Sequence, residues 1–195
     1  MSSSTSSSEQ AARAAKWTGF TGAFLGAAAL IAIAFLTVAF LIDPYDSGRS
    51  PLKLKEGVRP QGPRTALASR GRDPNFTGAI FGNSHIQLIS PEELRAKTGI
   101  PFVSLIAPAT QPREAFATID WFLRHHRKTP PKAIVVGIDN YWCTANPALP
   151  NEKPFPFWLM SRSLPGYIGG LMRFDLLEEL PRRISYLTSR KAARA

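Results

Sequence analysis

The stretch Gly78-Ala79-Ile80-Phe81-Gly82-Asn83-Ser84-His85 decides the fold that this 195-residue chain is predicted to adopt. A short apolar run that stops at a glycine is typical of a buried parallel strand. In open α/β sheets, ligands bind in the loops at the carboxyl ends of such strands. The run therefore presents Ser84, a residue with a nucleophilic hydroxyl, at a strand end where chemistry commonly takes place.

Two further short apolar runs, residues 102–106 and 133–138, alternate with helical patterns. The sequence Ser90-Pro91-Glu92-Glu93 has the N-cap serine, the proline at the first helical position and the glutamate at the third that start a helix. Residues 112–126 place apolar side chains on one face at helical spacing, which predicts an amphipathic crossover helix. This alternation predicts an α/β domain with a parallel sheet.

A long uncharged segment precedes this domain. No charged residue occurs among residues 19–42, a run of 24 residues. This exceeds the roughly 20 residues that a helix needs to cross the hydrocarbon core of a bilayer, so residues 17–42 are predicted to form a transmembrane helix. A cleaved signal peptide is the rival interpretation, but the run is too long and no A-x-A cleavage motif lies directly before Asp43. Lysine and arginine are nearly balanced around the span, so charge alone does not orient it.

The remaining boundaries follow from composition. Residues 1–16 begin with serine and other small polar groups and predict a disordered tail. Residues 43–75 are rich in arginine, lysine, glycine and proline without periodicity, and predict a basic linker. Residues 76–190 make up the predicted α/β domain, which ends in a helical apolar stripe over residues 174–190. Within the domain, residues 141–170 are rich in proline and aromatics, and either cover a site as a lid or pack on the sheet edge.

Charge and cysteine content limit the function classes. The formal charge of +10 fits a domain close to a membrane surface. No zinc-ligand spacing, helix-turn-helix or RNA-binding motif is found, so no nucleic-acid partner is expected. A single cysteine, Cys143, excludes an internal disulfide framework and a cysteine-based metal cluster. No metal site and no cofactor are predicted, and Cys143 is expected to be a buried small apolar residue.

The turn Gly82-Asn83-Ser84 has two interpretations. A serine hydroxyl becomes a nucleophile when a base takes its proton and when donors stabilise the developing oxyanion. Gly82 allows close backbone approach or a positive φ, and the amides after the turn can point at an oxyanion. This resembles a nucleophile elbow in its mechanics, although the G-x-S-x-G pattern is absent. The alternative is an ordinary turn, because glycine, asparagine and serine are common turn formers.

The run Ile80-Phe81-Gly82-Asn83-Ser84-His85, followed by Ser90-Pro91-Glu92-Glu93-Leu94, resembles the first block of the SGNH (GDSL-like) hydrolases. It is most similar to the membrane-anchored branch associated with acyl transfer to extracytoplasmic polymers. The steps Asp43-Pro44-Tyr45 and Val135-Val136-Gly137-Ile138-Asp139-Asn140 also look like this group.

The resemblance implies a flavodoxin-like three-layer parallel sheet and a serine nucleophile at Ser84. It also implies a single-pass membrane protein whose domain is extracytoplasmic (periplasmic). Its partners would be the lipid bilayer and an acylated or acyl-accepting polymer, and its activity that of a serine esterase or O-acyltransferase.

The chain departs from the family at two points. SGNH enzymes usually carry Gly-x-Asn-Asp in the third block, where the asparagine assists the oxyanion hole, whereas here the order is Gly137-Ile138-Asp139-Asn140. Asn140 is the candidate for that donor role. The family's base comes from a C-terminal Asp-x-x-His motif, and no histidine follows His126 in this chain.

The three histidines that the chain does contain are poorly placed to act as the base for Ser84. His125 and His126 end the crossover helix, at the edge of the sheet opposite Ser84. His85 is next to the serine, and neighbouring side chains diverge, so it is expected to line the pocket rather than form a dyad. Asp139 and Asn140 end the third strand on the same edge as Ser84, either as site members or as loop caps.

The predicted site therefore consists of Ser84 as the catalytic residue, with an oxyanion and pocket set of Gly82, Asn83, His85, Asp139 and Asn140. The alternative hypothesis is a catalytically silent, membrane-tethered binding or assembly component, or a truncated copy of a longer enzyme with an incomplete SGNH-like sheet. The missing histidine favours this alternative.

Overall fold

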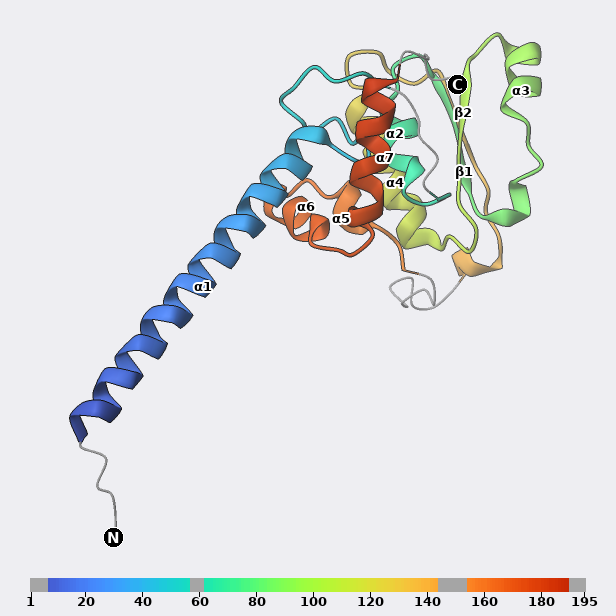
Figure 1. Cartoon of the computed structure of the whole chain (residues 1–195). Helices are drawn as coiled ribbons and strands as arrows, with labels where there is room; N and C mark the ends of the chain where they lie inside the picture. Colours follow the sequence, from blue (N-terminus) through green and yellow to red (C-terminus); the bar gives the residue numbers. More distant parts are fainter. Residues whose placement is uncertain (1–6, 57–61, 144–153, 190–195) are drawn as a thin grey trace. The chain divides into compact units, whose positions relative to one another are not determined.

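The computed structural model describes residues 7–56, 62–143 and 154–189 (Figure 1). The chain divides into two compact units, Met1–Val38 and Ala39–Ala195. The first contains most of one long helix, and the second contains the sheet and the remaining helices.

The long helix is α1, Ser7–Ile42. Its segment Lys16–Ile42 is long and apolar enough to cross a membrane, in agreement with the predicted span at residues 17–42. Residues 7–16 are helical rather than disordered, and residues 1–6 of the predicted tail lie outside the described part of the chain. The physical reason is that residues 9–15 are mostly alanine with glutamate, glutamine and arginine. These strong helix formers extend a helix that is already nucleated.

Three strands form a parallel sheet within the described residues: β1 Gly78–Gly82, β2 Phe102–Ile106 and β3 Ala133–Val136. Their order is β2-β1-β3, so the strand that carries the serine turn is central, and all of its residues are buried. Gly82 pairs with Ile106, and Phe81 pairs with Val136. The parallel α/β prediction is thus confirmed, although β3 ends two residues earlier than the predicted run.

The crossover helices lie on the two sides of these strands. Helix α3, Pro91–Thr98, connects β1 to β2, and α4, Pro112–His125, connects β2 to β3. Figure 1 shows α3 on one side of the strands and α2, α4 and α7 on the other. The predicted helix start is confirmed, because Ser90 Oγ accepts a hydrogen bond from the amide of Glu93 at 3.2 Å.

Helix α4 supplies much of the core on its side of the sheet. Its Phe122 ring packs edge-on against Phe81 of the central strand, with 5.7 Å between ring centroids. Trp121 is also buried, and its indole Nε1 donates to the carbonyl of Ala68 at 2.9 Å. The predicted amphipathic helix α4 therefore packs between the sheet and residues 66–72, which precede the sheet in sequence.

The stretch of residues 43–75, predicted as a linker, is different in the structure. Residues 43–47 are buried, and Ala66–Arg72 forms α2, with five buried residues packed beside α4. A Cβ added at Gly71 would lie 3.2 Å from the Trp121 ring, so small residues allow this close packing. Small residues give little apolar periodicity, which explains why the helix was missed. Residues 57–61 of this stretch lie outside the described part.

The C-terminal part contains three helices within the described residues: α5 Phe157–Met160, α6 Leu164–Leu171 and α7 Leu176–Thr188. The proline-rich stretch of residues 141–170 therefore includes helices whose Leu159, Met160 and Tyr167 are buried. Residues 144–153 of that stretch lie outside the described residues. Helix α7 confirms the predicted helical stripe, with Pro181 inside it.

Candidate functional site

The serine turn begins where β1 leaves the sheet. Asn83 is buried and precedes a short 3₁₀ turn, η1 Ser84–Ile86. Its side-chain Oδ1 accepts a hydrogen bond from the amide of His85 at 3.0 Å, which holds the turn. Ser84 is exposed at the first position of η1. The strand end thus presents the serine hydroxyl to solvent, while the asparagine before it points inward.

Gly82 and Gly137 both lie against Ile86. A Cβ at either glycine would lie 2.6 Å from Ile86 Cδ1, and Gly82 has a φ of +156°. The side chain of Ile86 therefore fills the space where β1 and β3 end. Gly82 makes the close approach that the sequence suggested, whereas nothing in the sequence indicated the role of Gly137 and Ile86.

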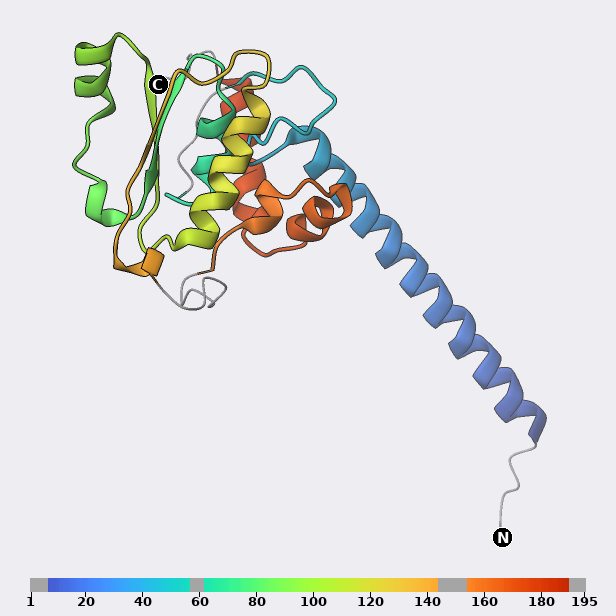
Figure 2. The ribbon, with the colours of Figure 1, turned by 180° about the vertical axis from the view of Figure 1, so that it is seen from behind.

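Asp139 brings two of the predicted residues together. Its Oδ2 accepts a hydrogen bond from Asn83 Nδ2 and lies 3.2 Å from His85 Nδ1. The carboxylate is mostly buried, whereas the His85 side chain is 62% exposed. Figure 2 shows η1 (green) and the turn after β3 (orange) at the same end of the strands. Asn83, His85 and Asp139 therefore form one polar cluster beside Ser84.

The amides of this turn are partly occupied. The His85 amide donates to Asn83 Oδ1, and the Ile86 amide donates to the carbonyl of Asn83 at 3.3 Å. Within residues 62–143 and the other described ranges, the Ser84 amide and hydroxyl have no hydrogen-bond partner. The Ser84 amide is thus the donor of η1 that remains for an oxyanion.

Asn140 starts the turn η2, Asn140–Cys143, and is exposed. No hydrogen bond of its side chain is found among the residues that the structure describes. The turn is closed by the Trp142 amide, which donates to the carbonyl of Asp139 at 3.0 Å. Asn140 therefore lies next to the cluster in sequence without contacting it.

The arrangement matches part of a nucleophilic site. An acid that holds one ring nitrogen of a histidine fixes the orientation of the imidazole and stabilises its charged form. Asp139 contacts His85 Nδ1 in this way and leaves Nε2 without a partner among the described residues. No hydrogen bond joins Ser84 Oγ to His85 in the described structure. In unliganded sites such contacts are often long and tighten only when substrate binds.

His125 and His126 have structural contacts elsewhere. His125 Nδ1 lies 2.8 Å from the carbonyl of Trp121. His126 is buried, with Nδ1 and Nε2 facing the carbonyls of Phe122 and Asp73. Both views show the C-terminal end of α4 at the opposite end of the strands from η1. This is the position expected from the sequence, far from Ser84.

Cys143 is exposed, which corrects the prediction that it is buried. The apolar contact of this turn is made instead by the preceding Trp142, whose ring packs against Phe116 with 5.3 Å between centroids. Among the described residues, no group of three or more histidine, cysteine or acidic side chains is placed to hold a metal ion.

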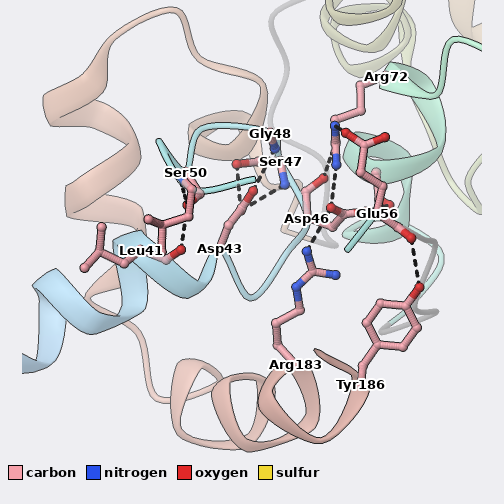
Figure 3. Close-up of polar contacts among 12 residues, drawn as sticks. Leu41, Asp43, Asp46, Ser47, Gly48, Ser50, Glu56, Arg72, Arg183 and Tyr186 are labelled. Carbon is pink, nitrogen blue, oxygen red and sulfur yellow. Dashed lines mark hydrogen bonds and ion pairs between the residues drawn. The ribbon is translucent and has the colours of Figure 1, made fainter. Parts of the chain in front are cut away.

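A second polar cluster, which the sequence interpretation missed, follows α1 (Figure 3). Asp46 Oδ1 accepts hydrogen bonds from Arg72 Nη2 of α2 and, at 3.0 Å, from Arg183 Nη2 of α7. Asp46 Oδ2 accepts a hydrogen bond from Ser69 Oγ at 2.7 Å. The Asp46 and Arg183 side chains are almost completely buried. This cluster joins α2 and α7 to the segment after α1.

Asp43 anchors the start of the same segment. Its Oδ1 accepts from the Ser47 amide at 2.9 Å and from the Tyr167 hydroxyl at 3.1 Å, and its Oδ2 accepts from the Gly48 amide at 2.7 Å. Burial and the Asp43 charge raise the pKa of Tyr167. The backbone φ is +48° at Asp43 and +49° at Asp46, a left-handed conformation that aspartate tolerates better than most residues. The signal in the sequence was two aspartates and a glycine directly after the span.

Comparison with the models of known protein families, with curated proteins and with solved structures gives no significant match.

Proposed function

We propose that this chain is a membrane-anchored SGNH-like protein that carries a serine esterase or O-acyltransferase site at Ser84. The observation that carries the proposal is the Asp139–His85 pair, 3.2 Å apart, beside an exposed serine at the carboxyl edge of a parallel sheet. In this proposal α1 is an uncleaved anchor. The domain faces outside the cytoplasm, and the sheet is the core of a flavodoxin-like three-layer fold.

The residues present have distinct roles in the proposed reaction. Ser84 Oγ attacks the carbonyl carbon of an ester or acyl donor, and the amide of Ser84 donates to the oxyanion. Although His85 is not in contact with Ser84 in the unliganded structure, in this proposal its Nε2 takes the proton from the hydroxyl when substrate is bound, while Asp139 holds the ring in place. The tetrahedral intermediate expels the alcohol, which regains the proton from His85. The acyl group on Ser84 then passes to water in an esterase, or to a hydroxyl of an extracytoplasmic polymer in a transferase.

A second function is favoured by the missing contact between Ser84 Oγ and His85 in the described structure. In this alternative the chain is a catalytically silent, membrane-tethered binding or assembly component. Asp139 then has the structural role of holding Asn83 and the η1 turn against the end of β3.

A serine-directed fluorophosphonate probe distinguishes the two functions. We expect the full chain, purified in detergent, to be labelled, and Ser84→Ala to abolish the labelling. Ser185→Ala is the matched control, because Ser185 is exposed on α7, and it should label as the parent does. If the parent chain is folded by circular dichroism and takes up no probe, the catalytically silent binding role is the function that remains.

The anchor is tested separately by carbonate extraction of membranes. The chain should stay in the membrane pellet, and its release into the soluble fraction would contradict anchoring by α1. A reporter enzyme that is active only outside the cytoplasm should be active when it is fused to the C-terminus. A well-expressed but inactive fusion would show that the domain faces the cytoplasm.

A further inference from the structure

We propose that α6 contacts the surface of the lipid bilayer through an apolar face next to the end of α1. This inference rests on the membrane anchoring proposed above and concerns a different part of the molecule from Ser84. The exposed apolar side chains, here named the α6 apolar surface, are Leu164 and Ile168 of α6 and Met172 and Phe174 directly after it.

The sequence of α6 has the composition of an interfacial helix. No charged residue occurs between Arg162 and Arg173. Leu164, Ile168 and Met172 follow one another at four-residue spacing and so share one face of the helix. The four side chains of the α6 apolar surface are 48%, 37%, 70% and 89% exposed, in chain order. Large apolar side chains that are exposed together in so short a stretch favour an interaction surface.

The core uses a different face of α6. Tyr167 and Leu171 are buried, and Gly170 lies so close to the Trp158 ring that an added Cβ would be 2.1 Å from Trp158 Cδ2. These residues fix the helix against the domain. The α6 apolar surface is therefore turned away from the core and is accessible to a lipid bilayer.

The contacts of the second unit place α6 beside the end of the apolar span. The last turn of α1, residues 39–42, belongs to this unit, and its Phe40 ring contacts the Tyr167 ring with 6.3 Å between centroids. The uncharged run of the span ends at Ile42, so this turn lies where a spanning helix leaves the hydrocarbon region. A helix packed against that turn lies at the level of the headgroups, where amphipathic helices bury their apolar faces.

A second segment flanks the same turn. Ser50 Oγ donates to the carbonyl of Leu41 at 2.6 Å, as Figure 3 shows. Two residues later, Leu52 is half exposed. An exposed leucine close to the end of the span is the side chain expected on a surface that enters the interface.

The contact is expected to be apolar, because no charged residue lies between Arg162 and Arg173. Arg162 Nη2 pairs with Asp120 at 2.5 Å, and Arg173 Nε lies 3.4 Å from Asp175. Arg124 shares the Asp120 carboxylate with Arg162, and Arg49 packs on the Tyr167 ring, so positive charge remains beside α6, but none is carried by the α6 apolar surface itself. We therefore expect the contact to form on vesicles of neutral phosphatidylcholine.

The test measures the depth of labelled cysteines in the full chain reconstituted into phosphatidylcholine vesicles. In a Cys143→Ser background, an environment-sensitive fluorophore is attached at Ile168→Cys or Met172→Cys. It is also attached at Leu88→Cys, an exposed position in the segment after η1, and at Ile31→Cys within the span. Quenching is compared for lipids that carry a nitroxide near the headgroup and near the chain terminus.

Labels at Ile168 and Met172 should be quenched, more strongly by the shallow than by the deep nitroxide, whereas the label at Leu88 should not be quenched. The label at Ile31 should be quenched more strongly by the deep nitroxide. Loss of quenching at Ile31 would overturn the anchor itself. Quenching at Ile31 without quenching at Ile168 and Met172 would overturn this inference alone.

Discussion

Asp139 holds His85 from across the sheet edge, with Oδ2 and Nδ1 3.2 Å apart, although the two residues lie on different strand ends. The same oxygen accepts from Asn83, so a single carboxylate links both ends of the turn that carries Ser84. The orientation of His85 therefore depends on β3 as well as on its own turn. A change at Asp139 is transmitted to both Asn83 and His85.

Replacing Asp139 with alanine should weaken labelling of Ser84 by the fluorophosphonate probe. Without the carboxylate, the imidazole loses the group that holds its orientation. General-base assistance is worth roughly a hundredfold or more in rate, so a loss of about that size is expected. The measurement is the second-order labelling rate, with Asp120→Ala on α4 as the control for an acidic residue remote from Ser84. An unchanged rate in a folded Asp139→Ala chain would remove His85 and Asp139 from the proposed mechanism.

Gly137 should be intolerant of a side chain unless Ile86 is shortened. An added Cβ would lie 2.6 Å from Ile86 Cδ1, so Gly137→Ala is expected to lower the free energy of unfolding by about 1–3 kcal/mol. The double variant Gly137→Ala with Ile86→Ala should be more stable than the sum of the single effects predicts. Denaturant unfolding followed by tryptophan fluorescence measures each variant. Additive effects would show that Ile86 and Gly137 are not in contact.

The same substitution at Gly82 serves as the comparison. Its φ of +156° is a conformation that side chains rarely adopt, so the strain at this position is in the backbone as well as in the contact with Ile86. Shortening Ile86 should therefore rescue Gly82→Ala less than it rescues Gly137→Ala.

Stability should fall in mild acid partly through His125. Burial lowers its pKa, and the neighbouring positive charges of Arg124 and Arg72 act in the same direction. The unfolded chain has the ordinary value of about 6.5, so below that pH the unfolded state binds more protons than the folded state. The stability due to neutral His125 is thus complete above about pH 6.5 and is lost as the pH falls through the lowered pKa.

The unfolding midpoint of the parent chain should accordingly drop between about pH 7.5 and pH 5.5. The drop should be smaller for His125→Gln, which does not titrate. Because the ring is partly exposed, the difference is expected to be small. Identical pH profiles for the two chains would show that His125 titrates alike in the folded and unfolded states.

The parallel sheet could be predicted because its strands are continuous apolar runs and the helix between the first two strands starts and ends with standard capping residues. Ser90 and Gly99 illustrate this, since each acts through local backbone geometry. The site residues at the strand ends could also be chosen, because strand order places Asn83 and Asp139 at one edge. Their direct contact, however, depends on side-chain directions that no spacing specifies.

The buried cluster around Asp46 could not be predicted from the sequence, because its members are far apart along the chain. Its partners are Ser69 and Arg72 of α2 and Arg183 of α7, and Arg183 lies 137 residues from Asp46 in sequence. Charged residues in a region rich in glycine and proline are most often solvated, so a linker was the expected interpretation. Only tertiary packing brings opposite charges together there, and with them the last turn of α1.

Removing the Asp46 carboxylate should destabilise the second unit strongly. Asp46→Ala leaves Arg183 almost completely buried without its ion pair, and among the described residues its Nε and Nη1 already have no hydrogen-bond partner. Breaking a buried pair from one side typically costs about 3–5 kcal/mol, because an uncompensated charge remains. Asp120→Ala, which breaks the ion pairs of a half-exposed carboxylate with Arg162 and Arg124, should cost about 1 kcal/mol or less per pair.

The double variant Asp46→Ala with Arg183→Met decides whether charge is the cause. It removes both buried charges and keeps an apolar side chain of similar length, so it should regain a large part of the stability that Asp46→Ala loses. Arg183→Met alone should cost less than Asp46→Ala, because Arg72 and Ser69 still contact the carboxylate. Denaturant unfolding of the full chain in detergent gives all four values. If the double variant is as unstable as Asp46→Ala, the loss comes from packing around residue 46 rather than from the buried charge of Arg183.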